Sequence, residues 1–246
     1  MSVAPTIALD GIVLNDRYSI SDIHRPWPKV NVMTEEVECR DGDVVTGLTL
    51  GPRSVSFRLW AFGADHELLM GSFAWLMELL TEEPEHRLSF GDEGGLVRVV
   101  TLQSYEPDYD EYAERASMQL DFTMHDPYRD AVATHDVAIP SGGAATFLVD
   151  HRAPRLVLAA SHATRDESTG LWGLTFDDVT HLRVELPTSS SVAVSIDCHE
   201  RHVMVGGVTG MIDLGSDWPK LGRGTHVVRM TQGTGAATLT IRKRCL

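Results

Sequence analysis

The chain has 246 residues, 43% of them hydrophobic, and carries a net charge of −14. This composition is typical of a globular protein, and its negative field excludes a protein that binds nucleic acid through phosphates. No apolar run of about 18 residues predicts a membrane span, and no basic segment followed by an apolar one predicts a secretory signal.

The first recognisable elements lie between residues 40 and 83. Residues 40–50 open with a turn signal and continue as a β-rich run, which breaks at Gly51-Pro52. Residues 54–59 then alternate apolar and polar side chains, as a half-buried strand does. A helix is predicted over residues 65–83, with Asp65 as its N-cap and Pro84 closing it. Its apolar face repeats at three- and four-residue steps: Leu69, Phe73, Leu76 and Leu80.

A β-hairpin and one further strand follow the helix. Residues 87–105 read as two strands around a glycine-rich turn at 91–95. Residues 115–125 alternate strictly and predict a half-buried antiparallel strand that ends at Asp126-Pro127. The acidic, tyrosine-containing stretch between these strands, residues 105–114, predicts a solvated loop or an interface.

A domain boundary is predicted between residues 133 and 134. Residues 130–145 are rich in small residues and contain Pro140 and Gly142-Gly143. The net charge also changes there: residues 1–133 hold 10 basic and 24 acidic side chains, and residues 134–246 hold 11 of each. The second half predicts a β-sandwich, because short strand patterns recur at 155–160, 171–176, 181–186, 192–197, 202–207, 226–231 and 237–242.

No catalytic constellation is recognisable, so the sequence predicts a protein that is not an enzyme and needs no cofactor. The segment Cys198–His202 looks like a zinc-protease motif, but its two histidines are three residues apart rather than four, and it predicts a polar turn with no metal. Trp172, flanked by Gly170 and Gly173, is the one candidate sugar contact, with core packing as the alternative. The sparse cysteines argue against a disulfide framework and indicate synthesis in a reducing cytoplasm: Cys39, Cys198 and Cys245.

Short motifs in a fixed order resemble the distal tail proteins (Dit) of siphophages and prophages. The first half carries Leu9-Asp10-Gly11-Ile12, Ser21-Asp22-Ile23, Arg40-Asp41-Gly42, Leu50-Gly51-Pro52-Arg53, Phe90-Gly91-Asp92-Glu93 and Asp126-Pro127-Tyr128. The second half carries Ala153-Pro154, Ile196-Asp197, Trp218-Pro219 and Leu221-Gly222. The similarity therefore spans nearly the whole chain.

The resemblance implies a structural virion protein located at the phage tail tip and assembled in the host cytoplasm. It implies a tail-tube-like β-barrel with one helix in residues 1–133, and a galectin-like β-sandwich in residues 134–246. It also implies a homo-hexameric ring that joins the tail tube to the tail-tip apparatus and lets DNA pass. Its partners would be the tail-tube, tape-measure and tail-tip, fibre or receptor-binding proteins. A lectin-like module for host recognition and another tail-tube or baseplate subunit are the alternatives.

Overall fold

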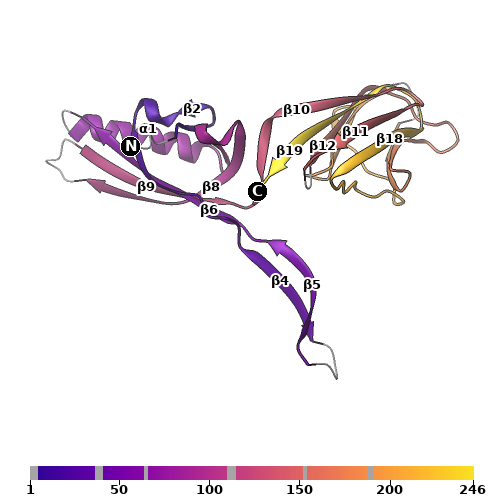
Figure 1. Cartoon of the computed structure of the whole chain (residues 1–246). Coiled ribbons are helices and arrows are strands. Elements are labelled where there is room, and N and C mark those ends of the chain that lie inside the picture. The colour runs from indigo at the N-terminus through magenta and orange to yellow at the C-terminus, as the bar shows by residue number, and fades with distance from the viewer. Residues whose placement is uncertain (1–4, 37–40, 64–65, 110–114, 152–153, 188–190) are drawn as a thin grey trace. The chain divides into compact units, whose positions relative to one another are not determined.

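The computed structural model describes residues 5–36, 41–63, 66–109, 115–151, 154–187 and 191–246. It divides into two compact units, Met1–Asp130 together with Leu246, and Ala131–Cys245 (Figure 1). Over the described residues the fold is mainly β with one α-helix, which confirms the predicted fold class. No helix among them is long and apolar enough to cross a membrane.

In the N-terminal unit, seven strands form one antiparallel sheet in the order β2-β1-β7-β8-β9-β6-β3. Among the described residues its end strands, β2 and β3, do not pair with each other, so the hydrogen-bonded sheet is open at that seam. The strands are β1 (Ile7–Leu9), β2 (Ile12–Val13), β3 (Ser19–His24), β6 (Arg53–Phe62), β7 (His86–Phe90), β8 (Leu96–Tyr109) and β9 (Arg115–Met124). Short 3-10 turns follow β2 and β7: η1 (Leu14–Asp16) and η2 (Gly91–Glu93).

The inner face of this sheet is the one that the alternating patterns predicted. Val55, Phe57 and Leu59 of β6 are wholly buried, and so are the alternate apolar residues of β9. The ring of Phe57 stacks on Phe122 with centroids 5.7 Å apart and meets Phe90 edge-on at 6.5 Å. Offset and edge-on contacts of this kind stabilise aromatic pairs beyond the area that they bury.

Helix α1 (His66–Glu82) packs its predicted apolar face into the same core. The four residues of that face are at most 3% exposed. Tyr18 stacks on Phe73 of the helix at 6.1 Å, and its hydroxyl donates a hydrogen bond to the Ser72 carbonyl at 2.7 Å. The predicted N-cap, Asp65, lies outside the described residues.

The acidic stretch at 105–114 differs in part from its prediction. Residues up to Tyr109 continue strand β8, which pairs with β9 as far as Tyr109↔Ala116. These residues were expected to form a loop, and the ladder of backbone hydrogen bonds explains why they are extended instead. Residues 110–114 lie outside the described part of the chain.

The C-terminal unit is a sandwich of two antiparallel sheets around one core. One sheet has the order β17-β16-β15-β12-β19-β10, and the other β11-β18-β13-β14. The first contains β10 (Arg129–Ile139), β12 (Arg155–Ala163), β15 (Val192–Asp197), β16 (His202–Val205), β17 (Val208–Thr209) and β19 (Ala237–Cys245). The second contains β11 (Ala144–Val149), β13 (Leu171–Phe176), β14 (Thr180–Glu185) and β18 (Gly224–Gln232).

The seven strand patterns predicted in this half are all strands of the sandwich. The segment 130–145, read from its small residues as a boundary, is mostly strand: β10 and the start of β11, joined by a turn at Pro140–Gly143. Small residues are compatible with extended backbone, so composition alone did not distinguish a linker from a strand.

Candidate functional site

The structure places the residues singled out in the sequence in two different environments, the core of the sandwich and a surface turn. Trp172 is 0% exposed and lies in the core of the sandwich. An indole without an exposed face cannot stack on a sugar, so the suggested contact at Trp172 is corrected to core packing. The segment Cys198–Arg201 forms the turn between β15 and β16, as predicted. Among the described residues, no group of three or more His, Cys, Asp or Glu side chains is arranged to hold a metal ion.

A two-stranded ribbon in the N-terminal unit is the first candidate site, and we call it the arm. It consists of β4 (Val30–Glu36) and β5 (Asp43–Leu50), which pair only with each other (Figure 1). Every residue of β4 is exposed. An isolated two-stranded ribbon is at best marginally stable in water, so a surface that covers it would stabilise it.

One face of the arm is apolar. The register places Val30 opposite Leu50 and Val32 opposite Leu48. Paired residues point to the same side of a ribbon, so these four side chains form one stripe, which we call the arm stripe. Val30, Val32 and Leu48 are 55%, 53% and 67% exposed. Asn31 and Thr49 pair on the opposite face, which is therefore polar at this level. Apolar stripes of this kind mark interaction surfaces.

The sequence predicted β5 but not β4. It also did not predict that no core of the described part of the chain covers the ribbon that the two strands form. The alternation of Val30 and Val32 was a usable strand signal. Alternation predicts two unlike faces, however, and not whether the rest of the same chain covers the apolar one.

Charged side chains fix the base of the arm to the sheet of the N-terminal unit. Arg25 binds Asp92 through two hydrogen bonds of 2.9 and 2.8 Å and Glu93 through a third of 2.9 Å. Arg53 Nε donates to the Pro26 carbonyl at 2.9 Å. Both strands of the arm therefore leave from residues that are tied down, because Arg25 precedes β4 and Arg53 follows β5. The arm is a projection with a fixed base.

Glu93 is the centre of this cluster. Its Oε1 accepts a short hydrogen bond from Arg98 and lies 3.4 Å from Arg129 Nη1, in addition to the bond from Arg25. Arg98 is wholly buried. Burial would raise the pKa of Glu93, but the hydrogen bond from Arg98 and the charges of three guanidinium groups outweigh it and lower that pKa. Glu93 in the turn motif of the sequence thus binds Arg98, five residues away, together with the more distant Arg25 and Arg129.

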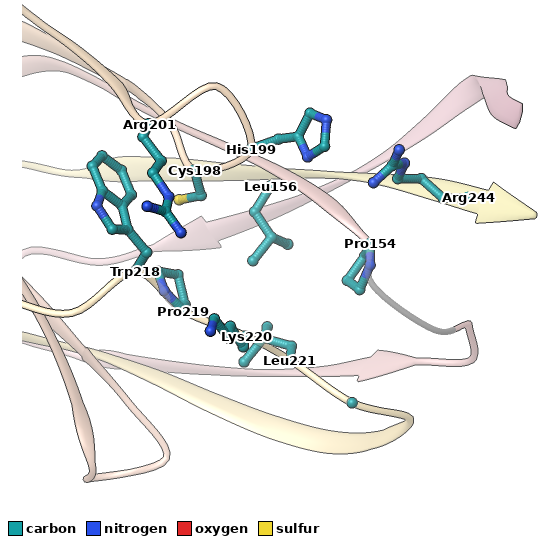
Figure 2. Close-up of a pocket in the computed structure, with 11 residues that line it drawn as sticks. Pro154, Leu156, Cys198, His199, Arg201, Trp218, Pro219, Lys220, Leu221 and Arg244 are labelled. Carbon is teal, nitrogen blue, oxygen red and sulfur yellow. The ribbon is translucent and has the colours of Figure 1, made fainter. Parts of the chain in front are cut away.

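The second candidate site is a cavity of about 410 Å³ within the C-terminal unit (Figure 2). The β15–β16 turn forms one wall and residues 218–222 form another, while β12 and β19 supply the rest. Figure 2 shows Arg201 and Trp218 toward one end of the cavity and Arg244 and Pro154 toward the other, with Leu156 between them. Two segments that the sequence singled out separately are therefore brought together here.

The β15–β16 turn is held by the carboxylate of Asp197. Its Oδ1 accepts the backbone N–H groups of His199 and Glu200 at 2.9 and 3.1 Å, and its Oδ2 accepts Arg155 at 2.9 Å. Burial would raise the pKa of Asp197, and these donors outweigh it and lower the pKa. Burial and the neighbouring Asp197 charge raise the pKa of the Cys198 thiol to about 12, so this thiol is neutral and unreactive at neutral pH.

The segment 218–222 is anchored on both sides. Before it, the Asp217 N–H donates to the His181 carbonyl at 2.8 Å. After it, the Gly222 carbonyl accepts His226 Nε2 at 2.9 Å, and His226 Nδ1 in turn binds Asp177 at 2.6 Å. Within it, Pro219 and Leu221 are buried, while Trp218 is half-buried against the core. The walls of the cavity are therefore formed by tied segments.

Comparisons with known proteins agree with this architecture. Residues 159–244 match the family model described as "Siphovirus-type tail component, C-terminal domain". The whole chain is similar to the crystal structure of the SPP1 Dit protein, described as a paradigm of the hub adsorption apparatus in phages that infect Gram-positive bacteria. That match has a TM-score of 0.74 and 16% identity, and it covers 98% of this chain and 99% of the other.

Two further matches are chains of the phage P2 baseplate in its activated conformation. The structure with Ca has a TM-score of 0.62 and 11% identity over 99% of both chains, and the one with Sr has 0.63 and 10% over 98% of both. No curated protein sequence matches the chain. The resemblance to distal tail proteins is confirmed by the family model for residues 159–244 and by the fold for the whole chain. The chain thus has the architecture of a structural component of phage tails and baseplates.

Proposed function

We propose that this chain is the distal hub of a siphophage tail. Copies of it form a hexameric ring that joins the tail tube to the tail-tip apparatus and leaves a central passage for DNA. The observation that carries the proposal is the match of both units together to a hub protein, over 98% of the chain at a TM-score of 0.74. The family model on residues 159–244 supports it independently of the fold comparison.

The arm supplies a ring contact in this proposal. A ring closes through heterologous contacts, in which one surface of a subunit meets a different surface of the next. The arm stripe is apolar and exposed, and it stands on a base fixed by Arg25 and Arg53. An apolar ribbon of this kind gains stability when a neighbouring subunit covers it. We therefore assign the arm to the contact between neighbouring N-terminal units.

The uneven charge of the chain fits a channel wall. The excess of acidic residues lies entirely in residues 1–133, the part that would surround the passage. A negative wall repels phosphates and lets DNA pass without adhering. The proposed role is structural and requires neither a catalytic group nor a cofactor. A surface-charge map of the assembled ring tests this step, and a basic lumen would contradict it.

Negative-stain microscopy of the purified chain tests the ring. We expect single rings with six-fold symmetry and a central hole, and a matching hexamer mass in light scattering. Long stacked tubes would instead favour a tail-tube subunit, and monomers at every concentration would contradict the hub.

Paired substitutions in the arm test its assignment. We expect the double variant Val32→Asp and Leu48→Asp to shift the population from rings to monomers, because it places two carboxylates in an apolar contact. The matched control is Asn31→Asp with Thr49→Asp, which adds the same charge to the opposite face of the same ribbon. If the double variant in the stripe forms rings as well as the control does, the arm stripe is not part of the contact between subunits.

A further inference from the structure

The charged side chains that line the cavity of the C-terminal unit are all basic. Arg201, Lys220 and Arg244 line it together with His199, and no carboxylate is among its lining residues. The two carboxylates of the adjacent turn are engaged elsewhere: Asp197 and Glu200 both accept hydrogen bonds from Arg155, at 2.9 and 3.1 Å. Neither Arg201 nor Lys220 forms an ion pair with another described residue. The cavity is therefore electropositive.

Arg201 and Lys220 line one cavity without an ion-pair partner among the described residues, and two such cations favour an anion. Guanidinium and ammonium groups form charge-assisted hydrogen bonds with carboxylates and phosphates. The two cations come from separate segments, Arg201 from the β15–β16 turn and Lys220 from residues 218–222.

The remaining walls are suited to the face of a small ring. Trp218 is half-buried and still lines the cavity, so part of its indole faces the open space. Pro154, Leu156, Pro219 and Leu221 add apolar surface around it. Indole and proline faces pack against the C–H face of a sugar ring, while polar groups hold its substituents. The volume of about 410 Å³ lies within the range of small-ligand sites, about 300–1,000 Å³.

We propose that this cavity binds an anionic saccharide unit, a sugar ring that carries a phosphate or a carboxylate. Arg201 and Lys220 hold the anion, and Trp218 packs against the ring. The segments that carry these groups are already tied in place, by Asp197 on one side and by His226 on the other. The site does not rest on ring assembly, because all its residues belong to one unit of one chain.

Isothermal titration calorimetry on the full chain tests the site with four probes: glucose 6-phosphate, glucuronate, glucose and inorganic phosphate. We expect saturable binding of glucose 6-phosphate or glucuronate, with one site per chain and an affinity that falls as salt rises. The two acids distinguish a phosphate-bearing from a carboxylate-bearing ligand. Glucose lacks the anion and inorganic phosphate lacks the ring, so both should bind at least tenfold more weakly.

Matched variants connect the binding to the cavity. Arg201→Gln and Lys220→Gln change exposed residues, and each should weaken binding by about tenfold or more, the effect of one lost charge-assisted hydrogen bond. Arg223→Gln and Lys243→Gln remove exposed cations of the same unit that do not line the cavity, and they should leave the affinity within twofold. Trp218→Phe keeps an aromatic face and should weaken binding less than Trp218→Ala does.

Several outcomes would overturn the proposal. It fails if neither acid binds up to millimolar concentration, or if the lining and control variants weaken binding equally. Equal affinity for glucose would remove the anion requirement, and inorganic phosphate binding as tightly as glucose 6-phosphate would remove the ring. The titration reports binding per chain and does not depend on ring assembly. A monomeric protein that binds the ligand would contradict the hub proposal and support the saccharide site. A ring that does not bind would support the hub proposal and contradict the saccharide site.

Discussion

Glu93→Gln is the substitution that most directly tests the base of the arm. It keeps the size of the side chain but removes the charge that three arginines share. In this variant Arg25 keeps its ion pair with Asp92 and its guanidinium is partly exposed to water, so losing the Glu93 contact costs Arg25 little stability. Arg98 is 0% exposed, and Glu93 is its only recorded ion-pair partner among the described residues. A buried guanidinium left without its anion dominates the cost.

The magnitude follows from that burial. Breaking a buried ion pair by removing one partner costs about 3–5 kcal/mol. For a protein of this size, each kcal/mol lowers Tm by about 2–4 °C, so we expect a fall of about 6–20 °C in the transition of the N-terminal unit. Glu85→Gln removes a carboxylate from an exposed position nearby and should change stability by no more than about 0.5 kcal/mol. Calorimetry of the two variants and the wild type gives the comparison.

The pH dependence of the same unit adds a second readout. Hydrogen bonds from Arg25 lower the pKa of Asp92, and the guanidinium cluster lowers that of Glu93 despite its burial. A folded-state pKa below the unfolded value stabilises the fold above the unfolded pKa, and this stabilisation is lost as pH falls through the folded pKa. The wild type should therefore lose stability below about pH 4, and Glu93→Gln should show a shallower loss. A variant within 2 °C of the wild type at neutral pH would refute the reasoning.

Two further predictions concern the C-terminal unit. Burial alone would lower the pKa of His226, but its hydrogen bonds to Asp177 and the Gly222 carbonyl outweigh burial and raise that pKa. The stabilisation from protonated His226 is therefore full below the unfolded-state pKa and is lost as pH rises through the folded-state pKa. The unit should melt a few degrees lower above neutral pH, and a thermal scan of His226→Gln should not show this pH dependence. Gly233→Ala should destabilise the unit by about 2 kcal/mol or more, because φ is +72° and the new Cβ would meet the Thr164 carbonyl. Gly206→Ala is the control: φ is +60°, but the new Cβ meets open space, so the cost should be about 1 kcal/mol. Equal denaturant midpoints for the two variants would contradict this reasoning.

Periodicity in the sequence was informative wherever one chain segment covers another. The apolar face of α1 and the alternation of β6 and β9 named the side chains that the structure buries. These patterns are local, since a face that meets the core must repeat with the period of its own element. The order of the short motifs likewise sufficed to identify the architecture, and the fold comparison agrees with it.

Both candidate sites depend on information that no local pattern holds. The arm stripe has the same alternation as a core strand, and only the tertiary structure leaves it uncovered. Glu93 and Arg25 are 68 positions apart in the chain, and no local pattern pairs them. Trp172 and Trp218 look alike as tryptophans among turn residues, yet one is wholly buried and the other lines a cavity.

The sequence by itself therefore determined the helix and the strands whose apolar faces are buried, the division of charge between the halves and the family resemblance. The tertiary structure alone decided which apolar faces are covered and which distant charges meet. The physical reason is that periodicity and propensity act over a few residues, whereas burial and electrostatics depend on what the rest of the chain brings into contact. For this protein those long-range contacts build the fixed base of the arm and the electropositive cavity.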